Sequence, residues 1–355
     1  MNTRFRSAVR LLCAGVFALA PAAGASAAEV MRPKVVVVAM FEPGRDTGDT
    51  PGELQLWVER EKLDRVIPLP AAFHDVRANA DGSVIAVVTG IGNTRAAASI
   101  MALGSDARFD FSRSYWLVAG IAGIDPADGT LGCAAWAEWI VNGDLGHEID
   151  AREAPAEWAT GYVPLRRSKP YELPRDTDDS SQVFRLDPGL VNWAFALTKD
   201  VKLPDTPGMA ERRKRFSEHP NARRAPFVLK GDTLSSETFW HGKRLNAWAN
   251  DWVKYHTDGR ANYVTTAMED TGTLQSLTWL ARAGKVDVKR VLVLRTASNF
   301  DQQEDGMTAA QSLFGEKLTT YSAYVPSLES AYLVGSKVVH ELVRDWARYE
   351  KELPR

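Results

Sequence analysis

The residues best suited to chemistry lie where apolar stretches of this sequence give way to short polar ones. Residues 291–294 are all apolar, and residues 295–302 then bring Ser298, Asn299 and Asp301 together. A strand that only fills a core should end in Gly, Pro or solvated charge, so this polar set predicts a ligand beyond a buried strand. Asn299 carries one acceptor and two donors on a short stem, which suits it to the edge of a heterocycle.

A second polar set lies in residues 265–273. Glu269 stands at the start of an otherwise apolar helical pattern. A carboxylate there is stabilised by the helix dipole, so helix capping is one reading. The two oxygens of a carboxylate can also accept hydrogen bonds from the two adjacent hydroxyls of a cis-diol. The residues alone leave both readings open.

Three glycine-containing loops follow further predicted strands. In residues 40–53, Gly44 and Gly48 free the backbone to approach an anion, and Arg45 can hold an anion bidentately. Glu42 in the same loop is a candidate for orienting a water molecule. A plain Gly/Pro turn explains the loop equally well.

The other two glycine loops are tight turns next to strands. Gly90 and Gly92 close a strand-to-helix turn, which is not a dinucleotide fingerprint because the third glycine is missing. Gly120 and Gly123 let the backbone pass close to a bulky group, or mark a β-bulge.

The elements that must position these residues alternate between strand and helix. Strands are predicted at residues 34–40, 84–89, 115–119, 134–141 and 291–294, and helices at 93–103, 190–197, 236–255, 268–283 and 328–349. The alternation predicts an α/β fold with a central, mostly parallel or mixed sheet flanked by helices. Residues 29–355 are expected to form a single domain with an insertion at about 144–224, whose charge runs indicate solvated faces or a lid.

Composition limits the class of protein. The chain has 355 residues, is 45% hydrophobic and carries a formal charge of -2, which excludes the basic stripe of a nucleic-acid-binding protein. Residues 1–28 combine Arg4, Arg6 and Arg10 with a short apolar run and small residues, as in a secretory signal peptide; an Ala-rich tail is the alternative. We therefore expect a periplasmic protein without a membrane-spanning segment, in which Cys133 is the one cysteine left after cleavage.

Six segments in this order resemble the purine nucleoside permease family, within the nucleoside phosphorylase and nucleosidase superfamily. They are FEPGRDTGDTPGE, GIGNTRAAASIMAL, VAGIAGIDP, GDTLSSETFWHG, TAMEDTGT and RTASNFDQ, and the resemblance covers residues 33–349. It implies a nucleoside phosphorylase-like fold. It also implies that Phe239 stacks on a purine, that Trp240 flanks the base, that Met268 lies under the ribose and that Glu269 binds the ribose hydroxyls.

Two departures from the family pattern bear on the reaction. Ser298 and Asn299 match a Ser-Asp pair whose Asp protonates purine N7; Asn cannot donate that proton but can hydrogen-bond N7 or a 6-oxo group, and Asp301 is the alternative acid. Phosphorylases also carry an Arg and a Ser around the glycine that matches Gly120, where this chain has Val118 and Ile121. Only Gly44 and Arg45 remain as a phosphate half-site, which favours hydrolysis over phosphorolysis.

The resulting hypothesis is a periplasmic protein that binds purine nucleosides and cleaves their N-glycosidic bond. Asn299, Glu42 and Asp301 are its candidate catalytic residues. The candidate binding residues are Glu269, Met268, Phe239, Trp240, Ser298, Gly120, Gly44 and Arg45. No metal or cofactor is expected beyond phosphate as a candidate co-substrate, and a homo-oligomer is expected by analogy. The alternatives are a non-catalytic nucleoside-binding component that assists uptake, and a structural α/β protein with an unused site.

Overall fold

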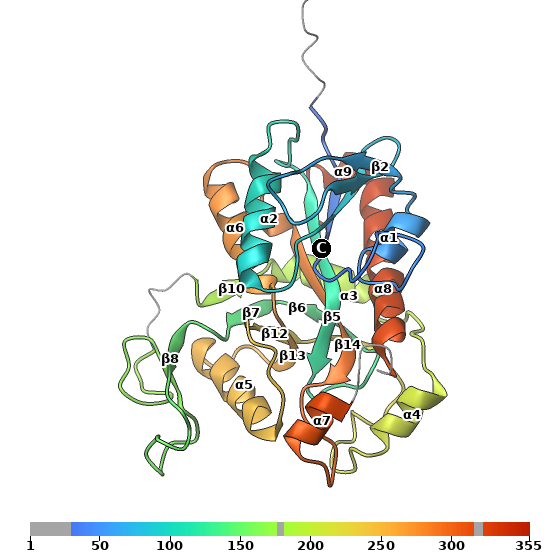
Figure 1. Cartoon of the computed structure of the whole chain (residues 1–355). Helices are drawn as coiled ribbons and strands as arrows, with labels where there is room; N and C mark the ends of the chain where they lie inside the picture. Colours follow the sequence, from blue (N-terminus) through green and yellow to red (C-terminus); the bar gives the residue numbers. More distant parts are fainter. Residues whose placement is uncertain (1–29, 176–180, 316–321) are drawn as a thin grey trace, which may run out of the picture.

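A computed structural model describes residues 30–175, 181–315 and 322–355 of the chain (Figure 1). The predicted signal peptide, residues 1–28, lies outside the described residues. Within the described part, helices cover both sides of one large sheet, as the alternating pattern predicts.

The centre of the sheet is built from apolar strands. β1 (Val35–Ala39) lies between β4 (Val84–Val88) and β5 (Tyr115–Ile124), and both pairs are parallel. Every residue of β1 and β4 is buried, which explains the unbroken β-branched runs in the sequence. β14 (Val291–Phe300) pairs with β5 in parallel and with β6 (Ala134–Ala137) in antiparallel, so the sheet is mixed.

Helices pack on both sides of these strands. α2 (Asn93–Ser105) and α6 (Asp270–Arg282) lie against each other on one side, and α8 (Tyr324–Arg344) lies with α1 (Gln55–Arg60) on the other (Figure 1). The apolar stripe predicted for the last helix is the buried face of α8, which contacts β5 and β14. The helical layers therefore hold the strand ends from both sides.

The remaining elements are further strands of the large sheet, a separate two-stranded sheet of β8 and β9, and shorter helices. They are β2 (Arg65–Ile67), β3 (Val76–Ala78), β7 (Trp139–Asn142), β8 (Gly146–Glu148), β9 (Tyr162–Pro164), β10 (Val183–Arg185), α3 (Pro188–Thr198), α4 (Pro207–Arg213), β11 (Val228–Lys230), β12 (Asp232–Ser235), α5 (Lys243–His256), β13 (Tyr263–Ala267), η1 (Val288–Arg290), α7 (Ala309–Gly315) and α9 (Trp346–Tyr349). β13 runs antiparallel to β5 and pairs Thr266 with Gly123.

Several predicted elements have different bounds in the structure, and two of these differences bear on the site. β14 does not end at Leu294 but continues to Phe300, with a register shift between Ala297 and Asn299. Ser298 and Asn299 therefore lie within the strand, whereas Asp301 follows it. The register shift is a β-bulge, which changes the direction of nearby side chains. The helix predicted from residue 236 begins only at Lys243, because Gly242 has a φ of 130° that a helix cannot contain.

The segment predicted as an insertion, residues 144–224, contributes to the main body. β10 pairs with β7 in the large sheet, and α3 packs against α8. Asp187 caps α3 by accepting the N–H of Leu190, directly before Pro188, which is a favoured helix start. The β8–β9 hairpin and α4 remain at the periphery (Figure 1).

Candidate active site

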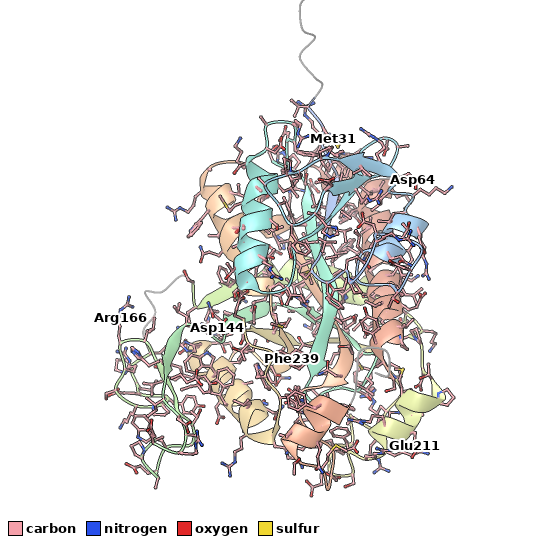
Figure 2. All side chains as sticks on the ribbon, viewed as in Figure 1. Met31, Asp64, Asp144, Arg166, Glu211 and Phe239 are labelled. Carbon is pink, nitrogen blue, oxygen red and sulfur yellow. The ribbon has the colours of Figure 1, made fainter. Side chains whose placement is uncertain are left out.

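A cavity of about 230 Å³ lies at the ends of β5, β13 and β14. It is lined by Phe41, Glu53, Ile91, Ile121, Ala122, Gly123, Phe239, Thr266, Ala267, Met268, Glu269, Ser298, Asn299 and Tyr324. Five predicted binding or catalytic residues meet there, although they come from three distant parts of the chain: Phe239, Met268, Glu269, Ser298 and Asn299. Figure 2 shows Phe239 in the lower half of the molecule, away from Met31 at the top.

One end of the cavity rests on a buried charge cluster. Arg295 is 1% exposed, and its Nη2 lies 3.1 Å from Oε2 of Glu269 and 2.5 Å from Oδ1 of Asp270. Its Nη1 donates to the carbonyl of Ile121 at 3.1 Å. Burial raises the pKa of Glu269 to about 7; Arg295 opposes this shift, and the carboxylates of Glu53 and Asp270 add to it. The cavity thus holds a carboxyl group that titrates near neutral pH.

Glu53 is a second carboxylate on the cavity wall. Its Oε2 accepts the N–H groups of Met40 at 2.7 Å and Phe41 at 3.0 Å, and its Oε1 accepts that of Ile121 at 2.7 Å. Burial raises its pKa as well, against the lowering effect of Arg295. A Cβ atom at Gly120 would lie 2.5 Å from Oε1 of Glu53, so the close approach of the two requires glycine there.

The sequence analysis missed Glu53 and assigned the water-orienting role to Glu42. In the structure, Oε1 of Glu42 accepts the N–H of Gly52 at 2.7 Å, and Oε2 accepts those of Leu54 and Gln55 at 2.8 and 3.1 Å. Glu42 therefore fastens the loop before α1 and does not line the cavity. The signal that could have found Glu53 is its place as the last residue of FEPGRDTGDTPGE.

The predicted phosphate half-site is also not at the cavity. Arg45 donates to the carbonyl of Gly48 at 3.2 Å, pairs with Asp49 at 3.5 Å, and has a side chain that is 77% exposed. The N–H of Arg45 donates to Asp49 Oδ2, and a Cβ at Gly44 would lie 2.5 Å from the same atom. This loop thus folds around its own carboxylate, Asp49.

Of the two predicted aromatic contacts, only Phe239 reaches the cavity. Its side chain is half exposed at the cavity wall. Trp240 is buried against Trp248 and Tyr263, with ring centroids 6.0 and 6.3 Å away. Trp240 does not line the cavity, so the structure does not bring it to the place where it was expected to flank a base.

The two candidate catalytic residues at the end of β14 differ in position. Asn299 lines the cavity; its Nδ2 donates to the carbonyl of Phe300 at 3.0 Å, and its Oδ1 accepts from Ser298 Oγ at 2.9 Å. Asp301 does not line it and accepts instead from Tyr263 Oη at 2.5 Å and Asn246 Nδ2 at 3.0 Å. Burial raises the pKa of Asp301 well above its usual range, and its carboxylate is bound by residues outside the cavity lining.

Comparison with known proteins bears on what this cavity is for. The sequence model of the purine nucleoside permease family matches residues 32–354. The chain belongs to that family. A purine nucleoside permease from Candida albicans is 30% identical over 329 residues, which cover 91% of this chain and 78% of the relative. A probable purine nucleoside permease from Schizosaccharomyces pombe is 28% identical over 334 residues, covering 90% and 91%.

Solved nucleosidases share the fold of this purine nucleoside permease family member. The 5′-methylthioadenosine/S-adenosylhomocysteine nucleosidase from Neisseria meningitidis, in complex with methylthio-immucillin-A, aligns with a TM-score of 0.50 at 15% identity, covering 87% of this chain and 100% of the nucleosidase. A mutant of the Helicobacter pylori nucleosidase, with 5′-methylthioadenosine in its active site, aligns with a TM-score of 0.51 at 16% identity, covering 87% and 99%. These likenesses confirm the predicted nucleoside phosphorylase-like fold.

Two further features concern metal binding and the membrane. Within residues 30–175, 181–315 and 322–355, no group of three or more His, Cys, Asp or Glu side chains is arranged to hold a metal ion. In the same residues, no helix combines the length and apolar character needed to cross a bilayer.

Proposed function

We propose that this chain binds a purine nucleoside in the cavity and hydrolyses its N-glycosidic bond. The observation that carries the proposal is the pair of buried carboxyl groups, Glu53 and Glu269, at one end of a cavity whose other end holds Phe239 and Asn299. The name shared by the relatives supports a purine nucleoside as ligand. The solved proteins with the same fold are nucleosidases, which supports cleavage as the reaction.

The cavity offers a contact for each part of a nucleoside. The Phe239 ring can stack on the base, an interaction of about 1–3 kcal/mol, and Asn299 can hydrogen-bond its edge. Met268 lies beside Glu269, in position to contact the ribose. Arg295 holds Oε2 of Glu269, whereas Oε1 has only a 3.4 Å contact to the N–H of Gly92. That oxygen is therefore suited to accept from the ribose hydroxyls.

The proposed reaction uses Glu53 as the general base. A raised pKa brings a carboxylate closer to the basicity needed to accept a proton from water near neutral pH. The water oxygen bonds to C1′ while its proton passes to Glu53. The electrons of the C1′–N9 bond move to the purine, which is stabilised by a hydrogen bond from Asn299 and then takes a proton from solvent.

A phosphate co-substrate fits this site poorly. The three N–H groups that could cradle an anion, those of Met40, Phe41 and Ile121, already bind the Glu53 carboxylate. A phosphate placed beside Glu53 and Glu269 would add negative charge to a cluster in which Arg295 is the cation. These contacts support hydrolysis over phosphorolysis.

The test is to incubate the purified protein with inosine, with and without phosphate, and to measure free hypoxanthine and the sugar product. We expect release of ribose at a rate that phosphate does not change. Glu53→Gln should lower kcat by about 100-fold or more while inosine still binds, because Gln keeps the shape but cannot accept the proton. Glu42→Gln, the matched control, should lower thermal stability and leave kcat near that of the unmodified protein.

Two results would contradict the proposal. Formation of ribose 1-phosphate only when phosphate is present would establish phosphorolysis. A larger loss of kcat in Glu42→Gln than in Glu53→Gln would show that the base is not Glu53.

Binding without turnover is the second candidate function. It is favoured by the relatives' name and by Asn299, whose amide cannot protonate a leaving base. Inosine binding in a calorimeter, with no hypoxanthine released over hours, would establish it in place of hydrolysis.

A further inference from the structure

A second cavity lies next to the loop that carries Phe239. It measures about 150 Å³ and is lined by residues of the β8–β9 hairpin and of α5, which are neighbours in the fold (Figure 1). Among the described residues, it shares no lining residue with the main cavity. One water molecule needs about 10–15 Å³ of such space, so this cavity can admit a small organic molecule.

Four aromatic rings line this second cavity. Trp248 and Trp252 lie one turn apart on α5, Trp240 comes from the loop before α5, and Tyr162 comes from β9. The three tryptophans are each 7% exposed or less. The ring centroid of Trp248 lies 6.0 Å from that of Trp240, 5.9 Å from that of Trp252 and 4.4 Å from that of Tyr162. The faces of such rings are negative and attract cations, most strongly for indole.

Two carboxylates also line the second cavity. Oδ2 of Asp144 accepts the N–H of Glu237 at 2.6 Å, which holds this charge beside the loop. Glu148 is the cross-strand partner of Tyr162 in the β8–β9 hairpin. Burial raises the pKa of Tyr162 to about 12, and the charge of Glu148 adds to this shift, so the two side chains interact. The described lining contains no Lys or Arg, and His147 is its one basic residue, so its net charge is negative.

Two of the three indoles lack a hydrogen-bond partner. Nε1 of Trp252 donates to the carbonyl of Asn142 at 2.9 Å. The buried Nε1 atoms of Trp240 and Trp248 have no partner among the described residues. An unpaired donor that is removed from water is costly to the folded state. Because both rings line the cavity, an oxygen atom of a bound molecule can supply the missing acceptor.

We propose that the second cavity binds a small quaternary ammonium compound that also carries an oxygen acceptor. Its positive charge lies against the aromatic rings and is balanced by Asp144 and Glu148, while its oxygen accepts from an indole N–H. A primary ammonium fits less well, because its three N–H groups need acceptors and indole nitrogens can only donate. This inference does not depend on the binding of a nucleoside in the main cavity.

Calorimetry on the full chain with choline and with 3,3-dimethylbutan-1-ol tests the charge. The two probes share their shape and hydroxyl group, and differ in whether the central atom is a cationic nitrogen or a carbon. We expect choline to bind about 10-fold or more tightly than the neutral alcohol. Equal affinities, or no binding of choline at millimolar concentration, would overturn the inference. Tighter binding of methyl glucoside than of choline would also overturn it, since a sugar is neutral.

Two acid variants assign choline binding to the second cavity. Glu148→Gln should weaken choline binding about 3-fold or more and leave the affinity for the neutral alcohol unchanged. Glu153→Gln is the matched control, because Glu153 is an exposed acid between β8 and β9 that does not line the cavity. It should change neither affinity. Equal weakening of choline binding in both variants would reflect overall charge and overturn the assignment.

The indole N–H signals give an independent readout by NMR. On titration with choline, the signals of Trp240 and Trp248 should shift. The signal of Trp116 is the control and should stay in place, because its buried Nε1 also lacks a partner among the described residues but its ring lies in the main core, away from this cavity. Saturable choline binding that shifts neither Trp240 nor Trp248 would place the ligand elsewhere and overturn the inference.

Discussion

At the scale of single residues, two acids of one loop differ in where their carboxylates lie: Glu53 lines the cavity and Glu42 does not. Glu42 and Glu53 both belong to the segment after β1, and both accept three backbone N–H groups. They differ in what surrounds those bonds: Glu53 is enclosed between β1 and β5 at the cavity, whereas Glu42 closes the turn before α1. Hydrogen bonds from the N–H groups stabilise the charged form of both carboxyl groups and lower their pKa values. Burial has the opposite and larger effect, so the pKa of each is raised.

Glu269 leads to a prediction about pH and stability. Its folded-state pKa of about 7 lies above the ordinary value of 4.5. As the pH rises, this carboxyl group therefore ionises in the unfolded chain at a lower pH than in the folded protein. The free energy of unfolding accordingly falls as the pH rises from about 4.5 through 7. Glu269→Gln cannot ionise at this position. Between pH 5 and 8 we therefore expect its free energy of unfolding to fall less than that of the unmodified protein, and the difference to be up to about 3 kcal/mol.

Urea unfolding of both proteins across this range measures the difference. If the free energy of unfolding of Glu269→Gln follows the same curve against pH as that of the unmodified protein, the raised pKa is not a property of Glu269.

At the scale of elements, the N-terminus of α2 is already occupied by a side chain. The Glu237 carboxylate accepts the N–H of Asn93 and, at 3.4 Å, that of Thr94. A Cβ atom at Gly92 would lie 2.8 Å from this carboxylate, so glycine is needed for the contact. Because Glu237 is two residues before Phe239, the same contact fixes the loop that carries the proposed stacking ring.

Glu237→Ala should therefore loosen both α2 and this loop. We expect faster hydrogen exchange at the amides of Asn93 and Thr94, a loss of about 1 kcal/mol in stability and weaker nucleoside binding. Hydrogen exchange read by NMR and calorimetry with inosine measure these effects. Glu341→Ala, which removes a carboxylate from the far end of α8, is the control. It should leave both the amide exchange of Asn93 and Thr94 and the binding of inosine unchanged. Unchanged amide exchange in Glu237→Ala would show that the carboxylate does not cap α2.

At the scale of the whole molecule, the proposed location outside the cytoplasm depends on residues 1–28. Their three arginines, apolar run and small residues are the features that export machinery reads. Expressed in a Gram-negative bacterium, the full chain should appear in the periplasmic fraction with a new N-terminus after Ala27 or Ala28, as read by N-terminal sequencing. A chain beginning at residue 29 should stay in the cytoplasm, and an uncleaved full chain found there would contradict the proposal.

The sequence by itself determined the layout of this protein and much of the candidate site. The α/β class, the mixed sheet and the burial of β1 follow from runs of β-branched residues, because local periodicity reports burial directly. The convergence of Phe239, Met268, Glu269 and Asn299 followed from the family resemblance, and the cavity contains all four.

Only the tertiary structure decided which neighbouring side chain faces the cavity. Glu53 rather than Glu42, and Phe239 rather than Trp240, line it, because direction within a loop depends on backbone contacts with distant strands. The same holds for Arg295, which reads as a strand residue but lies within hydrogen-bonding distance of Glu269 and Asp270, 26 and 25 positions away in the chain. Such pairings depend on sheet register and on the desolvation of charge, and neither is written in local sequence.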